Sequence, residues 1–318
     1  MLTPARKWAS PADVPRDVAP PDGRYSHEKL VVFVTVVLPL LALPVGVYLL
    51  WNHGVTWLDL ALMVVFYSFA GFGTTIGYHR LLTHRSFETS RFMRIFLTIG
   101  GAMGFQGPPV KWCAIHRRHH QSSDNEGDPH SPHLHGGGVR GVLRGLFHAH
   151  VGCLFMPDAD DLSRSIPDLL QDRALMRVDR LYALWVALGL ALPALLGGLI
   201  TQSGWGAFTG FIWGGLVRVA VMDHVTWSVN SVCHVFGSRP FRSNDRSTNN
   251  LPVALLSLGE GWHNNHHAFP TSARHGLRWW QFDISYVLIR AMALAGLAWN
   301  VRVPGPEAMR AKRASAST

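Results

Sequence analysis

The sequence predicts an all-α integral membrane protein, with four membrane-spanning helices in two hairpins and a helical cap on one side of the membrane. Of its 318 residues, 48% are hydrophobic and only 15% are charged, whereas ordinary soluble domains have about 25% charged residues. This deficit of charge excludes a disordered chain, a coiled coil and a nucleic-acid-binding tail, so no nucleic-acid partner is expected. The mean hydropathy is only +0.12, which indicates few spans and a large aqueous part.

Four stretches are apolar over the length of about 20 residues that a helix needs to cross a bilayer. They are Leu30–Trp51, Trp57–Tyr78, Leu181–Ile200 and Gly206–Val229. Two further apolar stretches, 95–110 and 284–299, are short or are interrupted by Gly-Pro-Pro and by Arg290. We expect these two to be interfacial or re-entrant segments.

The distribution of basic residues predicts how the spans are oriented. The connectors 52–56 and 201–205 carry no Lys or Arg, whereas residues 1–29 carry five, residues 79–180 thirteen and residues 230–318 ten. Because Lys and Arg gather in cytoplasmic loops, we expect both termini and the long connector in the cytoplasm of an inner-membrane protein.

One membrane domain, residues 30–303, accounts for most of the chain. Its spans are followed by a cytosolic cap, which we expect to form from residues 79–180 and 230–303. Residues 1–29 are expected to be a cytosolic N-terminal tail, not a cleaved signal peptide, and residues 304–318 a C-terminal tail.

Eighteen histidines are the most unusual feature of the composition. Three clusters and one looser element lie at or beyond the cytosolic ends of the spans, so all of them face one compartment. They are His79-x4-His84, His116-x2-His119-His120, His263-x2-His266-His267, and Asn230 with His234. Helix positions i, i+3 and i+4 share a face, so each His-x-x-His-His run is expected to direct three imidazoles toward one point. Nine imidazoles and one amide are too many for one ion and about right for two.

The spacing of the first pair requires a broad site. His79 and His84 are five residues apart, which is about 140° of rotation on an α-helix. They can serve one site only if the helix end loosens or if the site holds two metals. The remaining isolated histidines, His27, His53, His224 and His275, are interpreted as non-ligands.

The kind of metal follows from what the clusters lack. Cys113, Cys153 and Cys233 are too scattered for a disulfide framework or a zinc ribbon. The clusters also contain no His-Glu-x-x-His motif and no bridging carboxylate, which a metallohydrolase would need. Imidazole binds zinc, copper and iron. A nitrogen-only shell around two ions at a lipid boundary favours a redox pair that binds dioxygen, and iron is the preferred ion.

These clusters, in this order and separation, resemble those of the membrane fatty acyl desaturases of the stearoyl-CoA (delta-9) type, in a bacterial form. The resemblance extends from about Gly77 to Val303. Its motifs are Tyr78-His-Arg-Leu-Leu-Thr-His-Arg-Ser-Phe87, Gly104-Phe-Gln106, Trp112, Asp128-Pro-His130, His148-Ala-His-Val-Gly152, Thr226-Trp-x-x-Asn-Ser231, Arg239-Pro-Phe241 and Glu260-Gly-x-His-x-x-His-His-x-Phe-Pro270.

The resemblance implies a mushroom-shaped fold, two Fe²⁺ ions and an acyl tunnel beneath them. The metal ligands that it implies are His79, His84, His116, His119, His120, His234, His263, His266 and His267, with Asn230 acting through a water. The tunnel residues that it implies are Gln106, Trp112, Thr226 and Trp227. Apart from the metal ligands, no catalytic side chain is implied.

Several positions depart from the pattern or need a separate account. Ala114-Ile115 replaces charged residues that precede the second cluster in acyl-CoA-using animal members, and Cys153 replaces a tryptophan. The segment 130–147 is longer and rich in His and Gly, so an acyl-CoA, an acyl carrier protein and an intact lipid all stay open as substrates. We interpret His130, His133 and His135 as residues of a cap loop. Within a span, Arg218 would be costly unless paired, and Asp223 is its candidate partner.

Acidic side chains near the second cluster are candidates for orienting the imidazoles. These are Asp124, Glu126 and Asp128. Carboxylates in such positions commonly accept the second ring N–H of a metal-bound histidine.

The expected function is O2-dependent desaturation of a saturated long-chain acyl thioester or acyl lipid, giving a cis double bond, with the delta-9 position implied by the resemblance. The sequence contains no His-Pro-Gly-Gly haem motif, so electrons are expected from a separate ferredoxin or cytochrome. An arginine-rich cap would suit an acidic partner. A related di-iron hydroxylase or alkane monooxygenase is the alternative. A His-rich metal transporter is a distant one, since only His224, with Asp223, lies inside a span.

Overall fold

A computed structural model describes residues 28–51, 55–156 and 162–314 and confirms the all-α membrane class. The first half contains α1 (Glu28–Trp51), α2 (Trp57–Phe72), η2 (Gly73–Thr83), β1 (Glu88–Thr89), α3 (Arg91–Ala102), α4 (Pro109–Ser122), α5 (Gly138–His150) and η3 (Gly152–Phe155). The second half contains η4 (Leu162–Ser165), α6 (Pro167–Leu170), α7 (Arg173–Arg180), α8 (Tyr182–Thr201), α9 (Gly204–Gly210), η5 (Phe211–Val217), α10 (Arg218–Ser231), η6 (Val232–His234), α11 (Leu251–Leu256), α12 (His263–Ala268), α13 (Ile284–Leu294), β2 (Ala298–Trp299) and α14 (Pro306–Ala311). The strands β1 and β2 pair antiparallel.

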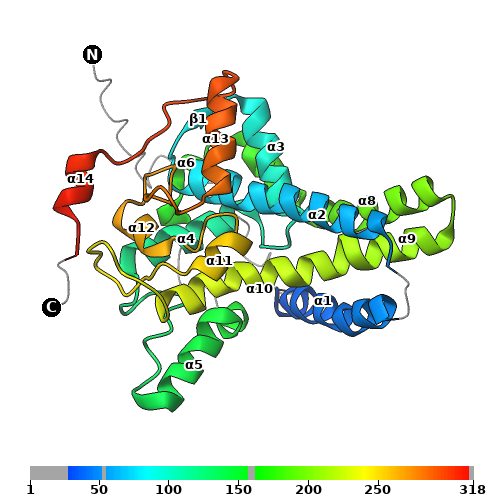
Figure 1. Cartoon of the computed structure of the whole chain (residues 1–318), viewed down its shortest axis with the longest axis horizontal. Helices are drawn as coiled ribbons and strands as arrows, with labels where there is room; N and C mark the ends of the chain where they lie inside the picture. Colours follow the sequence, from blue (N-terminus) through cyan, green and yellow to red (C-terminus); the bar gives the residue numbers. More distant parts are fainter. Residues whose placement is uncertain (1–27, 52–54, 157–161, 315–318) are drawn as a thin grey trace.

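The long apolar helices run side by side along the long axis of the molecule (Figure 1). Three of them are long and apolar enough to cross a membrane: residues 57–83, 182–201 and 204–234. In α1 the apolar helical stretch among the described residues is Thr35–Leu50. The turn between α8 and α9 forms one end of the molecule, and α4, α12 and α14 lie at the other (Figure 1). Two predicted spans, 57–78 and 206–229, continue as helix toward the cap.

The two continuing helices contain π-helical segments, η2 and η5, in which backbone hydrogen bonds join residues i and i+5. In η2 this segment ends at His84, whose N–H donates to the carbonyl of His79 at 3.1 Å. The sequence patterns did not indicate this geometry, because apolar periodicity alone does not distinguish a π-helix from an α-helix.

Glycines allow α3 to approach η2 closely. A Cβ atom on Gly73 would lie 2.0 Å from the amide nitrogen of Gly101, and one on Gly101 would lie 2.6 Å from the ring of Tyr78. No larger residue fits at either position without a shift of backbone or ring. This contact fixes the end of the second long helix, which carries His79 and His84.

Arg218 is fully buried within the longest helix and is bound by backbone carbonyls. Its guanidinium donates to the carbonyls of Gly214, Met103 and Gly189 at 3.2, 2.9 and 2.9 Å. The expected partner Asp223 makes no direct ion pair with Arg218 among the described residues; it accepts a 2.6 Å hydrogen bond from the amide of Gln106. The hydrogen bonds from Arg218 satisfy the N–H donors of the guanidinium, and they join α10 to α8 and to the end of α3.

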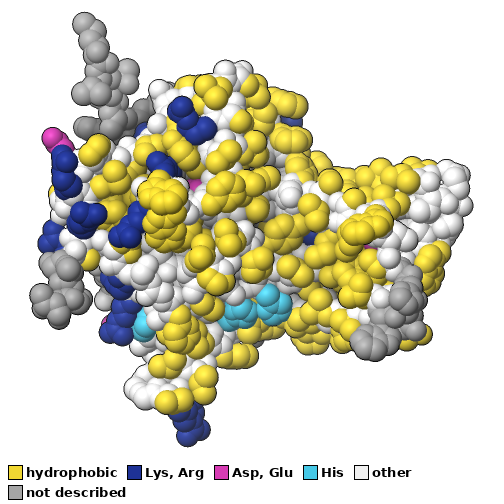
Figure 2. All heavy atoms as spheres, in the orientation of Figure 1, with side chains coloured by type: hydrophobic (Ala, Val, Ile, Leu, Met, Phe, Trp, Pro, Cys, Tyr) yellow, Lys and Arg dark blue, Asp and Glu magenta, His cyan; other side chains and the backbone are white. Residues whose placement is uncertain are grey.

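A second buried arginine connects the cap to the spans. Arg117 of α4 donates to the carboxylate of Asp168 at 2.6 and 3.0 Å and to the carbonyls of Leu82 and Thr83 at 2.8 and 3.2 Å. Because breaking such a buried pair costs about 3–5 kcal/mol, α4 is held firmly against the end of η2. Figure 2 shows apolar side chains over the helical bundle, while Lys and Arg gather at the cap end.

Candidate metal centre

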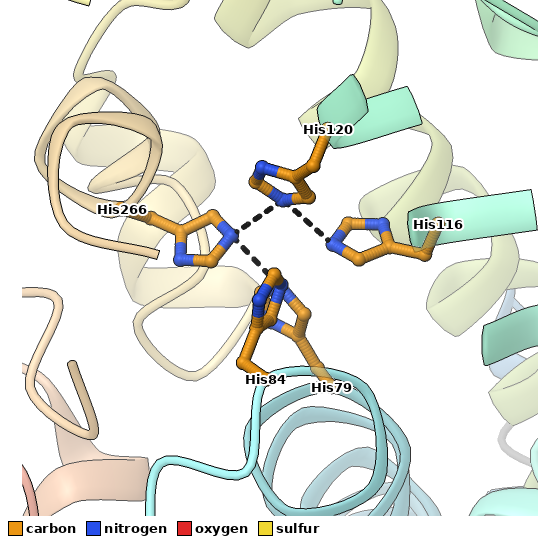
Figure 3. A group of neighbouring side chains, drawn as sticks. All are labelled: His79, His84, His116, His120 and His266. Atoms are coloured by element: carbon orange, nitrogen blue, oxygen red, sulfur yellow. Dashed lines mark hydrogen bonds between the residues drawn. The ribbon is translucent and has the colours of Figure 1, made fainter. Parts of the chain in front are cut away.

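The nine histidines of the predicted clusters lie in two adjoining groups. The five-His group consists of His79, His84, His116, His120 and His266, and the four-His group consists of His119, His234, His263 and His267. Within each group, every ring offers one nitrogen, and these nitrogens all lie within 4.8 Å of one another. Figure 3 shows the five rings of the first group directed toward one another from η2, α4 and α12.

The π-helix explains how His79 and His84 belong to the same group. An i to i+5 hydrogen-bonding pattern winds more residues into each turn than an α-helix does. Residues five apart then come close to one face, and the two ring centroids are 4.8 Å apart. The 140° separation expected on an α-helix does not apply here.

Each His-x-x-His-His run divides between the two groups, which differs from the expectation that all three rings point to one place. His116 and His120 join the five-His group, whereas His119 joins the four-His group. In the other run, His263 and His267 join the four-His group and His266 the five-His group. Neighbouring helical residues are about 100° apart, so i and i+4 converge while i+3 diverges. The two runs thereby connect both groups.

The ring nitrogens have the spacing of ligands around shared ions. The Nε2 atom of His120 lies 3.1 Å from that of His116 and 2.9 Å from that of His266. In the four-His group, Nε2 of His263 is 3.0 Å from the Nε2 atoms of both His234 and His267. Nitrogens bound at about 2.1 Å to one ion lie roughly 3.0–3.4 Å apart. The observed spacing therefore fits a metal ion in each group.

Burial favours the neutral form of six of these imidazoles, which is the form that binds metal. Burial, followed by the neighbouring imidazoles, holds the pKa well below its ordinary value for the cap members of both groups: His116, His119, His120, His263, His266 and His267. In addition, Nε2 of His84 and Nε2 of His119 are buried and, among the described residues, have no hydrogen-bond partner. Unpaired buried nitrogens are costly, and a metal ion would satisfy them.

Carboxylates orient three rings of the four-His group. The Nδ1 atoms of His119, His234 and His267 lie 2.9, 2.8 and 2.7 Å from a carboxylate oxygen. The three acceptors are, in the same order, Asp128, Asp124 and Asp245. An imidazole that donates from Nδ1 presents the lone pair of Nε2 to a metal. Asp124 and Asp128 were candidates from the sequence, whereas Glu126 is exposed and makes none of these contacts.

Among the described residues, one carboxylate contacts the five-His group: Glu260 accepts from Nδ1 of His79 at 2.5 Å. Glu260 also pairs with Arg80 at 3.1 Å and with His275 at 3.4 Å. Burial alone would raise the pKa of Glu260, but His79, His275 and Arg80 hold it well below its ordinary value. Arg80 is itself fully buried and also pairs with Asp283 at 3.0 Å. Glu260 thus remains ionised and holds His79 in place.

Sequence reasoning missed the orienting role of Glu260, Asp245 and His275. Glu260 begins the Glu-Gly-x-His motif, so its place three residues before His263 was a usable signal. Asp245 lies 22 residues from His267, and only the folded loop brings the two together. His275 was interpreted as a non-ligand; its ring centroid lies 4.5 Å from that of His266, with the two rings tilted by 38°, and it does not belong to the five-His group.

The histidines of the cap loop surround the four-His group. His130 is buried with its ring 4.2 Å from that of His119, and burial lowers its pKa to about 3. His133 donates from Nε2 to the carbonyl of His234 at 2.7 Å. The ring of His135 instead contacts that of His148, with 4.4 Å between the ring centroids. His130 and His133 therefore support the group from the side of the loop.

A large cavity of about 790 Å³ opens beside both groups, within the size range of ligand pockets. His79, His116 and His263 contribute to its wall. The wall also includes all four predicted tunnel residues and Asn230, which are Gln106, Trp112, Thr226, Trp227 and Asn230. Apolar residues from α1, α2, α10 and α11 form a further part of it, and charged residues such as Lys111 and Asp179 also line it. A long apolar chain in this cavity would pass directly by the imidazoles.

Comparison with known proteins gives a consistent result. The family model for fatty acid desaturases matches residues 55–302. The hex-5-enoyl-[acyl-carrier protein] acetylenase of Moorena producens is 43% identical over 279 residues, which are 87% of each chain. The sn-1 stearoyl-lipid 9-desaturase of Anabaena variabilis is 37% identical over 76% of this chain and 82% of the relative. The acyl-CoA C20 Δ5-desaturase of Anemone leveillei is 37% identical over 78% and 75%.

Proposed function

The chain belongs to the fatty acid desaturase family and is an oxidoreductase of lipid metabolism; from this premise we propose that it introduces a cis double bond into a saturated acyl chain. The proposal includes a di-iron centre, dioxygen as oxidant and electrons from a separate carrier protein. The observation that carries it is that imidazoles of both groups line one cavity of about 790 Å³.

The residues of the two groups would each hold one Fe²⁺ ion, with Asn230 contributing through a water. Bound iron would supply the oxidising power that an unactivated C–H bond requires and that no side chain has. In the overall reaction, an acyl –CH2–CH2– unit, O2, two electrons and two protons give –CH=CH– and two waters. Imidazole ligands without a bridging carboxylate distinguish this centre from that of a hydrolase.

The protein's own contribution is to orient the ligands and position the chain. Asp124, Asp128, Asp245 and Glu260 fix four imidazoles in the tautomer that presents Nε2 to the metal. The cavity wall determines which methylene pair lies beside the imidazoles. Because misplacement by about 1 Å costs about 100-fold in rate, this wall would determine the double-bond position, for which we propose delta-9.

The group that carries the acyl chain differs among the relatives. The relatives named above act, by their names, on acyl-carrier-protein, lipid and CoA substrates. We propose a long-chain acyl thioester or acyl lipid as the substrate. The positive-inside distribution of Lys and Arg supports an inner-membrane protein with both termini and the metal centre in the cytoplasm.

Lipid analysis of a heterologous host tests the proposal. Cells that express the chain should accumulate monounsaturated acyl chains that have lost two hydrogens relative to the saturated precursor, with the double-bond position read from derivatised fragments. Cells that express His120→Ala at the same membrane level should match the empty-vector control. A product that has gained one oxygen would instead identify a hydroxylase. An unchanged lipid profile in cells that contain the membrane-inserted wild-type protein and a reductant would contradict the proposal.

A further inference from the structure

The helix α5 carries an apolar face that is largely exposed. The residues of this face follow the spacing i, i+3, i+4, i+7 and i+8, which places them on one side of a helix; they are Val139, Val142, Leu143, Leu146 and Phe147. Val139 is 78%, Leu143 62% and Phe147 66% exposed. Figure 1 shows α5 projecting below α10, away from the helices of the bundle. An exposed apolar face of this kind indicates contact with a partner or with a membrane.

The opposite face of α5 holds the helix in this orientation. Gly141, Gly145 and Ala149 are buried on that face. A Cβ atom on Gly145 would lie 1.8 Å from the carbonyl oxygen of Pro132. One on Gly141 would lie 2.2 Å from the carbonyl oxygen of Gly136. Because rotation of α5 would bring larger side chains into these contacts, the apolar face stays outward.

Two arginines border the apolar face. Arg140 and Arg144 are both exposed and lie one helical turn apart. Residues 129–156, which include α5 and the segments on either side of it, contain no Asp or Glu. The charge of α5 is therefore purely positive. An apolar face bordered by basic side chains is typical of helices that lie in the surface of an anionic membrane.

The C-terminal end of α5 lies at the level where a predicted span begins. α5 is followed by η3, which lies next to α1. Phe155 of η3 lines the large cavity together with Val32 and Val36 of α1. These two α1 residues belong to the first turns of the predicted span 30–51, at its predicted cytoplasmic end. Phe33, between them, is 53% exposed, as expected of a residue that faces lipid. The apolar face of α5 is therefore close to the lipid-facing surface of the bundle.

We propose that α5 is a membrane-surface helix: its apolar face inserts between the lipids of an anionic leaflet, and Arg140 and Arg144 bind the headgroup phosphates. Lipid is the occupant that fits, because the apolar face adjoins the end of a span and its border is basic. An anionic leaflet attracts each basic side chain that lies near its surface. Because η3 follows α5 directly, this binding would also fix one wall of the cavity relative to the bilayer. Binding of α5 to lipid does not depend on the proposed reaction.

A fluorescent nitrobenzoxadiazole probe on Leu143→Cys tests the proposal in the full-length protein. One matched probe is placed on Val64→Cys, which is 62% exposed on the span helix α2, and another on Ala308→Cys, which is exposed on α14 at the cap end of the molecule (Figure 1). All three proteins carry Cys153→Ala, because the other two cysteines are buried. Each is reconstituted into phosphatidylcholine vesicles with graded phosphatidylglycerol, and quenching is measured with lipids that carry a doxyl group near the headgroup or deep in the chain.

The probe on Leu143→Cys should be quenched, most strongly by the shallow doxyl group, and more so as phosphatidylglycerol increases. The probe on Ala308→Cys should not be quenched. Adding Arg140→Glu/Arg144→Glu should reduce quenching at position 143 by about three-fold or more and remove its dependence on phosphatidylglycerol, while the probe on Val64→Cys stays unchanged and shows that the protein is still inserted.

Equal quenching at positions 143 and 308 would overturn the proposal, as would quenching at position 143 that is the same in neutral and anionic vesicles. A blue-shifted probe at position 143 that no doxyl lipid quenches would also overturn it, because protein, such as a second copy of the chain, would then cover α5.

Discussion

The five-His group and the four-His group contain similar ligands but differ in what surrounds them. The four-His group has a carboxylate on three of its rings, Asp124, Asp128 and Asp245. The five-His group has one carboxylate, Glu260, and it is shared with Arg80 and His275. The four-His group therefore has fewer imidazoles and more negative charge nearby, whereas the five-His group has more imidazoles and less negative charge nearby.

In the proposed centre, this difference would make the two ions unequal. Carboxylates that accept the second N–H of an imidazole make it a stronger donor to the metal. Nearby negative charge also stabilises the more oxidised form of a bound ion. The four-His group should therefore hold its ion more tightly. The comparison indicates that the two sites have separate roles within one centre, and the following experiments test it.

The largest expected effect comes from removing one ligand of each group. His266→Ala and His267→Ala alter adjacent residues that belong to different groups. Each variant should lose desaturation by more than about 100-fold, because the chemistry needs both ions. Iron content, measured by plasma mass spectrometry, should fall from about two to about one in both proteins. His135→Ala is the control, and full activity in either ligand variant would remove these histidines from the centre.

The orienting carboxylates should give the next largest effect. Asp245→Asn should weaken metal binding by about 10–100-fold and leave the fold intact, since the amide oxygen of Asn can still accept the hydrogen bonds that Ser243 and Ser247 donate to Asp245. Glu260→Gln removes a partner of the fully buried Arg80, so it should also lower the melting temperature, by an amount equivalent to about 3 kcal/mol. Titration with iron and thermal unfolding measure the two effects. Equal melting temperatures in both variants would contradict the distinction.

The chelator concentration that removes the bound ion should differ between the two sites, and this effect should be smaller than those of the carboxylate variants. His266→Ala leaves the four-His group complete, and His267→Ala leaves the five-His group complete. The ion that remains in His266→Ala should need about 10-fold more chelator for its removal, because three carboxylates strengthen its ligands. Retained iron is measured after dialysis against graded chelator. The reverse order would show that ligand number outweighs the surrounding carboxylates.

The smallest effects are expected at the two extra histidines. His130 lies beside His119 in the four-His group, and His275 lies beside His266 in the five-His group. We expect His130→Gln and His275→Gln to retain two ions and to lose only a few-fold in activity, since these rings support ligands without binding metal. Iron analysis of each purified variant checks this. Loss of one ion would add that residue to the ligands.

The sequence predicted which histidines come together but not how they divide. The His-x-x-His-His spacing places its members on one side of a helix, yet the 100° between adjacent residues sends His119 and His120 to different groups. The pairing of His79 with His84 depends on a π-helix, which has no signature in residue type. Asp124 and Asp128 were accessible because they lie near the second cluster, whereas Asp245 reaches His267 only through the folded loop.

The apolar helices were predictable because the bilayer imposes both their length and their composition. The hydrogen-bond partners of Arg218 were not predictable, because the carbonyls that accept its hydrogen bonds come from three separate parts of the chain. The segment predicted as a C-terminal tail forms α14 and joins the 237–249 loop. Its sequence is short and polar and gives no sign of that contact.

The π-helical segment η2 makes the centre depend on the number of residues before His79 as well as on their identity. Deleting one residue between Gly73 and Tyr78 would allow the backbone to return to ordinary α-helical winding while every ligand stayed in the chain. His79 and His84 would then turn about 140° apart, and only one of them could reach the five-His group. The additional residue in the π-helical turn therefore acts as a spacer that keeps His79 and His84 on the same side of the helix.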